Sequence, residues 1–473
     1  MKFSLIVLLL LSVSATFCLA VQTGEQPGLK ARLGERGLNF GKDLVLEFVK
    51  NRLNSVPIPD VSGDSPLTYS LTNIEIVSFD LTQSTLETSA PNLFIPNVVD
   101  ASVAVSATWE ASRVVDLGIF SFTLQGAGNL TASASGVNLR QEIGLGRNSN
   151  DNPAFSIGSC TASIGNIEAD LGDASFDALL KTFDEFVETE LSNRLCPALK
   201  NLLEKQAAKL TERYDLIFSL TSQLGVDLGL VCDPEASEDN LLFSLRGRCF
   251  PRNNPSLSFP FSAPVMPPLS STSQMVRLGI NHYVLDTLLY SLWKEDLLDH
   301  EISASQISAV IGQTLTAADV ATLLQKFSLH GNKPLHFLLR FVDLPDVHFD
   351  SDGITVYAHY EVAAGVLTDE EFQDVYTAAA VINATASMNV LEGRLFGRIE
   401  NLEVRVTQAG EFPVELVNKL IEDNLPDQIL PVLNNLAKTG YEIPDYMGYT
   451  LENTSVETKE NALEIGTDIS RVK

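Results

Sequence analysis

The chain has 473 residues with 32 basic and 60 acidic side chains, which gives a formal net charge of −28 at pH 7. A polyanion is repelled by so acidic a protein, so nucleic acid is excluded as a partner. The chain is also too long for a single hydrophobic core, and we expect two domains of about 200 residues each.

The first twenty residues have the pattern of a secretory signal peptide. Lys2 precedes an unbroken apolar run at positions 6–11, and small residues follow up to Ala20. A run of this length is too short to span a bilayer, so we expect cleavage after Ala20, which also removes Cys18. The sequence therefore predicts a secreted, extracellular protein. Candidate glycosylation acceptors, each in an Asn-x-Ser/Thr triplet, are Asn129, Asn383 and Asn453.

Four cysteines remain after cleavage, and an even number in a secreted chain predicts disulfides. Three pairings are possible. The preferred one joins Cys160 to Cys196 and Cys232 to Cys249, because each pair closes a local loop. For Cys232 and Cys249, the alternative is a free thiol or a bond to a second chain.

The first half reads as helix, antiparallel strands, helix and strand. An amphipathic helix is predicted over residues 37–53, alternating segments from Leu67 to about Ala169 read as strands, and a long helix starts near Asp173. Each helix has an apolar stripe, because its apolar residues recur at three- and four-residue steps. The stripe residues are Leu44, Val45, Phe48, Val49, Phe176, Leu179, Phe183 and Val187.

The second half repeats this order after a proline-rich connector. A helix is predicted over residues 282–293, strands follow with a hairpin turn at 350–353, and a long helix is interrupted at Pro426 and Pro431. A last strand begins near Ala462. The apolar positions on these two helices include Val284, Leu285, Leu288, Val417, Leu420 and Ile421.

Sequence signatures of catalysis are scarce. The chain has no Gly-x-Ser-x-Gly, His-Glu-x-x-His or Cys-x-x-Cys motif, so we expect no enzyme activity. His348 and His359 flank the 350–353 turn, where two ordinary strand residues are favoured over a metal site. A calcium loop at this turn is rejected, because histidines stand at its first and last positions. We expect neither a metal nor a cofactor.

In the order of these elements the chain resembles the bactericidal/permeability-increasing protein family, which includes lipopolysaccharide-binding protein and the plasma phospholipid- and cholesteryl-ester-transfer proteins. The matching features are the cysteine pair around the long helix, SAPVMPPL followed by MVRLGINHYVLDTLLY, and FPVELVNKLIEDNLPDQILPVLNNLAKTGYEIP. The resemblance implies an α+β fold of two elongated antiparallel barrels, each covered by long helices and joined by a central sheet, in a boomerang-like duplicated lipid-binding fold. The expected limits are 1–20 for the signal peptide, 21–250 for the N-terminal barrel, 251–275 for the connector and central sheet, and 276–473 for the C-terminal barrel.

The resemblance also changes how the apolar stripes are interpreted. Taken alone, they fill a core. In that family such faces line a pocket that holds one phospholipid in each barrel, so the stripe residues become candidate lipid contacts. Burial of acyl chains is favourable by about 0.8 kcal/mol per methylene, which requires no charged anchor. Bound phospholipid is accordingly the expected ligand.

Charge separates two functional hypotheses. Bactericidal members of the family bind lipopolysaccharide phosphates with a cationic tip, whereas residues 57–175 here contain only Arg113, Arg140 and Arg147 and no lysine. The favoured hypothesis is a secreted carrier or transfer protein for phospholipid. The alternative is an innate-immune lipopolysaccharide-binding protein that acts on Gram-negative bacteria. Membrane and lipoprotein surfaces are further expected partners, and a monomer is favoured.

Overall fold

The computed structural model describes residues 25–53, 60–64, 68–80, 83–116, 120–170, 195–197, 199–209, 216–270, 273–295, 297–322, 324–368, 371–391, 394–410, 414–415, 418–419, 430, 434, 441–442 and 449–471. They form two compact units. Unit 1 is built from Arg32–Asp215 and Asp233–Phe243, and unit 2 from Leu216–Cys232, Ser244–Lys473 and the residues just before Arg32. Because the two units interleave along the chain, the domain limits expected from the sequence stay a prediction.

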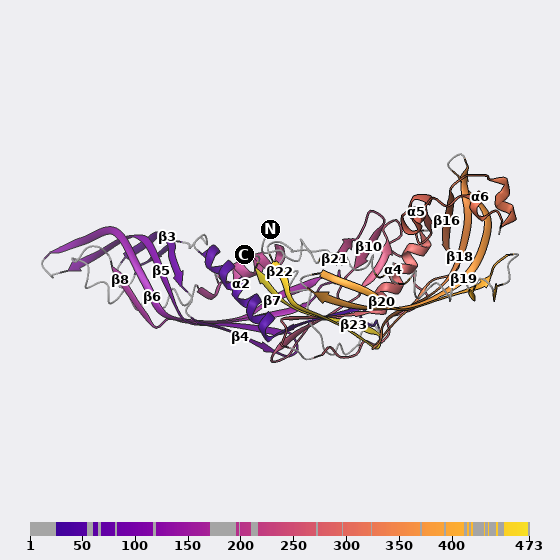
Figure 1. The fold of residues 1–473 in the computed structure, drawn as a ribbon. Helices are drawn as coiled ribbons and strands as arrows, with labels where there is room; N and C mark the ends of the chain where they lie inside the picture. The colour runs from indigo at the N-terminus through magenta and orange to yellow at the C-terminus, as the bar shows by residue number, and fades with distance from the viewer. Residues whose placement is uncertain are drawn as a thin grey trace. The chain divides into compact units, whose positions relative to one another are not determined.

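Unit 1 is built around one antiparallel sheet of seven strands (Figure 1). In order across the sheet, its main strands are β2 (Val61–Gly63), β3 (Thr68–Asp80), β5 (Leu93–Asp116), β6 (Ser121–Arg147) and β7 (Pro153–Ser163). Two shorter strands are added at the sides, where β4 (Gln83–Ser89) pairs with β5 and β8 (Asn166–Asp170) pairs with β6.

Alternation of side chains decides which face of this sheet is buried. On β6, Leu130, Ala132 and Ala134 are buried, whereas Thr131 and Ser133 between them are exposed. Successive side chains on a strand point to opposite faces, so one face is apolar and the other is polar. Strands β5 and β6 have 24 and 27 residues, far above the usual length of about 5–6, and together form a long hairpin.

The helix of unit 1 follows a short strand. Strand β1 (Leu29–Gly34) leads directly into α2 (Glu35–Leu53), which confirms the helix predicted over residues 37–53. At the end of β1, Gly34 pairs with Asn240 of β12 (Asn240–Leu245), which in turn pairs with β11 (Glu235–Ala236).

Unit 2 contains a second large antiparallel sheet of seven strands. Its strands, in order, are β15 (His300–Ile302), β16 (Leu335–Phe341), β18 (Gly353–Thr368), β19 (Glu371–Leu391), β20 (Arg394–Gln408) and β21 (Tyr441–Glu442), with β17 (Asp346–Asp350) paired to β18. The predicted hairpin turn joins β17 to β18. There Asp350 Oδ1 accepts from the backbone N–H of Asp352 and Gly353, and Gly353 has a φ of 142°.

Two smaller groups of strands complete unit 2. The first is β14 (Val276–Asn281), β23 (Ala462–Arg471) and β22 (Tyr449–Lys459), paired in that order. The second is β13 (Arg248–Pro251), β10 (Leu224–Asp227) and β9 (Ile217–Ser219). Antiparallel sheets with a few covering helices make both units α+β, as the sequence predicts.

The described helices of unit 2 are α4 (His282–Lys294), α5 (Ala304–Ile311), α6 (Ala317–Val320) and the 3₁₀-helix η2 (Gln325–Leu329). Each begins where the sequence has an N-terminal signal or turn. Asn281 caps α4 by accepting from the N–H of Tyr283, and Ser303 forms a capping box with Gln306 at α5. Of the helices in the described ranges, none is long and apolar enough to cross a bilayer.

One disulfide prediction holds and the other is wrong. Cys160 and Cys196 are bonded, with 5.7 Å between their Cα atoms. Cys249 instead is a free, buried thiol, so the predicted bond between Cys232 and Cys249 is not formed. The physical reason lies in β13, which α4 covers. The backbone N–H of Cys249 donates to Thr287 Oγ1 (3.0 Å), and burial raises the pKa of its thiol to about 11.

Candidate functional site

An apolar surface lies between α2 and the sheet of unit 1. Val45 and Leu46 of α2 pack against a buried cluster contributed by β3, β5, β6 and the β7–β8 region. The buried members are Phe79, Val98, Ala101, Val103, Ala134, Val137 and Ile164. Around them, large apolar side chains remain only partly buried, namely Ile76, Val105, Leu139, Ile167 and Leu195. The surface thus has a buried centre and a border of large apolar side chains that are only partly covered.

Two lysines attach α2 to neighbouring strands. The Lys42 ammonium donates to the backbone O (2.9 Å) and hydroxyl (3.0 Å) of Ser84 on β4, and Lys50 pairs with Asp80 at 2.8 Å. The Lys42 side chain is largely buried, so its stem covers apolar surface while its head is bonded. The Lys50 pair is exposed and contributes at most about 1 kcal/mol. Lysines near the first helix are therefore structural here.

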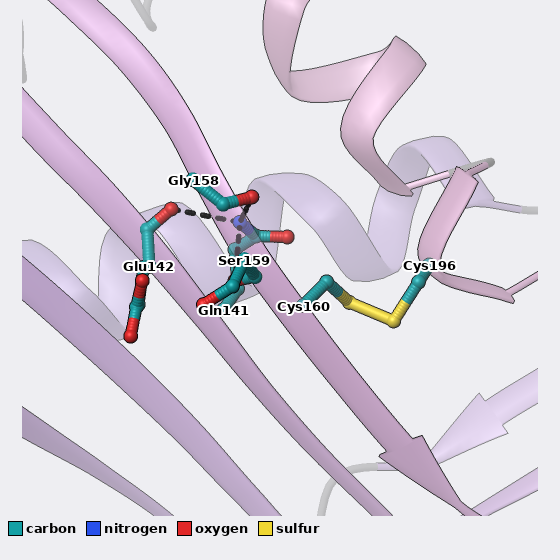
Figure 2. The surroundings of a disulfide bond; sticks show 6 residues. All are labelled: Gln141, Glu142, Gly158, Ser159, Cys160 and Cys196. Carbon is teal, nitrogen blue, oxygen red and sulfur yellow. Dashed lines mark hydrogen bonds between the residues drawn. A yellow bond between two sulfur atoms is a disulfide. The ribbon is translucent and has the colours of Figure 1, made fainter.

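The disulfide holds the second helical segment of unit 1 against the same surface. Cys196 follows Leu195, which packs on the apolar cluster, and its partner Cys160 lies on β7 (Figure 2). Beside it, the buried Gln141 amide donates to the carbonyls of Glu142, Gly158 and Ser159 at a break in the β6–β7 register (Figure 2). This side chain supplies donors where the bulge interrupts the ladder.

Unit 2 has a comparable surface beneath α4. Leu285 and Leu289 of α4 pack against a buried cluster of Val347, Phe349 and Leu463. Partly buried side chains of several strands surround this cluster: Ile280, Ile354, Val356, Met388, Val456 and Ile465. Both units thus place one amphipathic helix over a sheet face whose border of large apolar groups is incompletely covered.

The opposite face of α4 is fixed by buried polar groups and rings. Thr287 and Ser291 are fully buried, and the Ser291 hydroxyl donates to the carbonyl of Cys249 at 3.2 Å. The proline-rich connector lies along the same helix, with Phe261 centred 6.0 Å from Tyr283 and 5.9 Å from Tyr290. These contacts orient α4, so that Leu285 and Leu289 face the sheets.

The sequence-predicted contact residues fall into three groups. Val45 and Leu285 pack in the two apolar surfaces, and Leu44 is buried on α2. Val284 and Leu288 are half-buried and lie outside the described cluster of unit 2. The remainder, with Phe48 and Val49 counted by their side chains, lie outside the described residues: Phe48, Val49, Phe176, Leu179, Phe183, Val187, Val417, Leu420 and Ile421.

Two asparagines that the sequence reading missed pair with the outer edge of β20. Asn418 Oδ1 accepts from the N–H of Val406 (2.7 Å) while its Nδ2 donates to the carbonyl of the same residue (3.0 Å). Asn434 does the same with Ile399, at 2.8 and 2.9 Å. Each side-chain amide therefore takes the place of a neighbouring strand. An Asn in an otherwise apolar helical stretch is the signal that could have indicated this.

Two arginines of the unit 1 sheet lie beside carboxylates. In unit 1, Arg140 lies 3.3 Å from Glu87 and 3.6 Å from Glu142, and Arg147 lies 3.3 Å from Asp151. Within the described ranges, no three His, Cys, Asp or Glu side chains are placed to hold a metal ion.

A buried ion-pair network ties the three strands β14, β22 and β23 of unit 2. The Glu464 carboxylate is 2.5 Å from Arg277 and 2.8 Å from Lys459, and it is fully buried. Burial alone would raise the pKa of this carboxyl, but the hydrogen bonds from Lys459 and Arg277 outweigh it and hold the pKa below its usual range.

Comparison with known proteins agrees with this architecture over the whole described chain. Two family models match, the N-terminal domain of the LBP / BPI / CETP family over residues 37–206 and the C-terminal domain of that family over residues 218–471.

Individual relatives are distant in sequence but match over nearly full length. Bactericidal permeability-increasing protein of Rattus norvegicus is 22% identical, covering 96% of this chain and 95% of the relative. Lipopolysaccharide-binding protein of Homo sapiens is 22% identical, with 95% of each chain covered. Phospholipid transfer protein of Homo sapiens is 23% identical, covering 96% and 92%.

A solved structure agrees with the fold. The crystal structure of lipopolysaccharide binding protein aligns with a TM-score of 0.57 and 19% sequence identity, and it covers 95% of this chain and 100% of that one.

Proposed function

Because the chain belongs to the LBP / BPI / CETP family, whose members bind or transfer lipids, we propose that it is a secreted carrier that holds one phospholipid in each unit. The observation that carries the proposal is the pair of helix-over-sheet apolar surfaces. In each, a buried cluster is bordered by large apolar side chains that stay partly exposed. Acyl chains laid along such borders remove this apolar area from water, at about 0.8 kcal/mol per methylene.

Charge favours a neutral or zwitterionic lipid over lipopolysaccharide. Two of the three arginines of the unit 1 strand region, Arg140 and Arg147, are already in ion pairs with carboxylates. If either arginine left its carboxylate to bind a phosphate, the loss of that ion pair would offset part of the free energy gained from the new contact. The lipopolysaccharide-binding alternative is supported by the names of two relatives, and it requires an affinity that depends steeply on salt. No catalytic step is assigned to the chain.

Lipid extraction and native mass spectrometry test this proposal. Protein made in a eukaryotic secretory system should release two phospholipids per chain and should transfer phosphatidylcholine between vesicles. Val45→Gln should remove the lipid of unit 1 alone, and Leu285→Gln the lipid of unit 2 alone. Asp43→Asn, on the exposed side of α2, is the matched control that should keep both. The absence of lipid in the parent protein, together with no rise in melting temperature on adding phosphatidylcholine, would contradict the proposal.

A further inference from the structure

A polar side chain ends the apolar face of the unit 1 sheet. Gln141 is 1% exposed and lies on β6, two positions beyond Leu139, which borders the apolar cluster. Alternate residues of a strand share a face, so the two side chains lie on the same face, about 7 Å apart along the strand. On β7, Cys160 is paired with Gln141, and its disulfide partner Cys196 follows Leu195 of the same border. The amide thus stands at one end of the surface proposed to hold the lipid of unit 1.

The hydrogen bonds of this amide fix its orientation. Its nitrogen donates to the carbonyls of Glu142 (2.7 Å), Gly158 (3.3 Å) and Ser159 (3.2 Å), where the β6–β7 register is interrupted (Figure 2). Turning the amide over would place its oxygen against three carbonyl oxygens, all of which are acceptors. The nitrogen is therefore held at the backbone, and the oxygen is directed away from these carbonyls.

The oxygen of the same amide lacks a donor. In the part of the chain that the structure describes, four buried side-chain atoms have no hydrogen-bond partner: Gln141 Oε1, Ser244 Oγ, Arg248 Nε and Arg277 Nε. The last three belong to unit 2, so Gln141 Oε1 is the one of these four in unit 1. Buried polar atoms are nearly always hydrogen-bonded, because an unpaired one has lost its hydration without replacement. This oxygen therefore calls for a donor from another molecule.

The place of the oxygen restricts what that donor can be. A lipid bound on the apolar cluster lays its acyl chains along Val137 and Leu139, and the next group of the lipid reaches Gln141. The donor must therefore lie at the root of the acyl chains, within about two strand positions of them. A sphingolipid has an amide N–H and a hydroxyl there, and a diacylglycerol has a hydroxyl. Phosphatidylcholine has neither an N–H nor an O–H group.

Burial disfavours a charged donor at this oxygen. Gln141 is almost fully covered, and its oxygen is a single neutral acceptor. Taking an ammonium out of water at such a place costs more than one hydrogen bond returns. The ammonium of phosphatidylethanolamine is also separated from its acyl chains by a phosphate and a glycerol. A neutral donor that adjoins the chains satisfies both constraints.

We propose that Gln141 Oε1 accepts a hydrogen bond from the amide N–H or hydroxyl at the root of the acyl chains of a bound lipid, so that unit 1 prefers such donor-bearing lipids over phosphatidylcholine. This inference rests on the proposed lipid-carrier function and names the lipid class for unit 1. The three bonds of the amide nitrogen hold the oxygen in place before the lipid binds, so little side-chain freedom is lost on binding. Gln141 thus determines specificity, whereas the apolar surface supplies affinity.

Competition between two lipids with the same phosphocholine headgroup tests the proposal. Protein with Leu285→Gln, expected to hold lipid in unit 1 alone, is equilibrated with vesicles of equal parts sphingomyelin and phosphatidylcholine, and its bound lipid is quantified by mass spectrometry. We expect about a tenfold preference for sphingomyelin, which corresponds to one net hydrogen bond. Gln141→Leu should abolish this preference while one lipid stays bound. Gln125→Leu, the same substitution at an exposed position of β6, is the matched control that should keep it.

Because Gln141 also holds the interrupted β6–β7 register, a second variant and two lipid pairs make the test independent of folding. Gln141→Lys keeps a donor for the three carbonyls but removes the acceptor, so it too should lose the preference. With unsubstituted Gln141, sphingomyelin methylated at its amide nitrogen and hydroxyl should bind about tenfold more weakly than sphingomyelin, and the O-methyl ether of diacylglycerol more weakly than diacylglycerol. A response to the first pair alone identifies a sphingolipid as the ligand, and a response to both identifies either donor as sufficient.

The lipid preference and the carrier function fail separately. Protein without any bound lipid would overturn the carrier function. One lipid bound in unit 1 without a preference for sphingomyelin would show that water or a protein group serves the Gln141 oxygen, and would overturn the specificity alone. The specificity would also be overturned by a preference that persisted in both Gln141 variants. Tighter binding of phosphatidylethanolamine than of sphingomyelin would do the same, because the donor would then belong to the headgroup.

Discussion

The β5–β6 hairpin of unit 1 and the β18–β19 hairpin of unit 2 end in opposite ways. In unit 2, α6 and η2 cover the strands near the hairpin end, so that Phe327 and Val366 are fully buried. In unit 1, Phe122 and Leu124 near the hairpin end stay exposed. The same kind of element is thus covered by other parts of the chain in unit 2, whereas large apolar side chains stay exposed near its end in unit 1.

The short helices that cover the hairpin end in unit 2 are specified by local sequence signals. The residues between β15 and β16 contain two capping boxes, Ser303 with Gln306 and Thr316 with Asp319, and Gly312 ends α5 at a φ of 77°. The Thr316 side chain and backbone donate to Asp319, which lowers the pKa of that carboxyl. These signals specify the short helices that lie between β15 and β16.

The largest expected effect contrasts the two hairpin ends directly. Phe327→Ala should destabilise unit 2 by about 3–5 kcal/mol, because it empties a fully buried site. Phe122→Ala should change the free energy of unfolding by no more than about 0.5 kcal/mol in lipid-free buffer. Thermal and denaturant unfolding measure both. Comparable losses would mean that the end of the β5–β6 hairpin is part of a packed core, and the contrast would then be lost.

Acid should weaken unit 2 through Glu464. The pKa of this carboxyl is lowered in the folded protein, so its contribution is complete above the unfolded value of about 4.3 and disappears as the pH falls through the folded value. Glu464→Gln should cost about 3 kcal/mol at pH 7, because Arg277 and Lys459 lose a buried partner, and should flatten the acid limb of the stability curve.

The matched control for this variant lies on the neighbouring strand. Glu457 pairs across the ladder with Glu464 but is exposed, so Glu457→Gln should stay within about 1 kcal/mol at every pH. Urea unfolding between pH 3 and 7 provides the curves. An unchanged acid limb in Glu464→Gln would show that other carboxylates set the acid sensitivity.

The two units also differ in how the edges of their strands are covered. The outer edge of β20 is paired by Asn418 and Asn434, whereas no described strand pairs with the outer edges of residues 113–116 and 120–124 near the end of the β5–β6 hairpin. Asn418→Ala should cost about 1–2 kcal/mol, because the N–H and C=O of Val406 lose their partner. Hydrogen exchange at Val406 should accelerate while Ile399 stays protected. Equal acceleration at both residues would indicate that the two asparagines act as one unit.

The sequence predicted these elements unevenly, for physical reasons. Helix periodicity located α2 and α4, and alternation together with the Asp350–Gly353 turn located the strands, because these patterns are local. The lipid contacts predicted on α4 agree with the structure only in part. Leu285 packs in the apolar surface of unit 2, whereas Leu288 lies outside its cluster. Which part of a stripe faces a sheet depends on what packs on the other side, here Cys249 and the aromatic connector.

Contacts between residues far apart in the sequence explain the other points at which the structure differs from the sequence predictions. Cys232 and Cys249 are close in sequence, which favoured a local bond, but β13 is held under α4 by Thr287 and Ser291. The contacts of Asn418 with Val406 and the exposure of Phe122 and Leu124 also depend on which elements lie side by side in the fold. Capping signals predict the short helices of unit 2, but that these helices cover β18 and β19 is a contact between segments far apart in the sequence.

The smallest effect concerns two glycosylation acceptors, which are both exposed but differ in whether the side-chain amide nitrogen is engaged. Asn129 is exposed on β6, whereas Asn453 has a φ of 51° in a bulge and its Nδ2 donates to Asp468 at 3.0 Å. Asn129 should therefore carry a glycan in protein secreted by eukaryotic cells, and Asn453 should not, because its amide nitrogen is engaged in the folded ladder. Asn129→Gln should reduce the mass by one glycan and change the free energy of unfolding by less than about 0.5 kcal/mol. Glycopeptide mass spectrometry decides the case, with Asn453→Gln as the paired variant that should leave the glycan mass unchanged. A glycan at Asn453 would show that modification precedes the pairing of β22 with β23, and the hydrogen bond of this amide in the folded unit would then not determine occupancy.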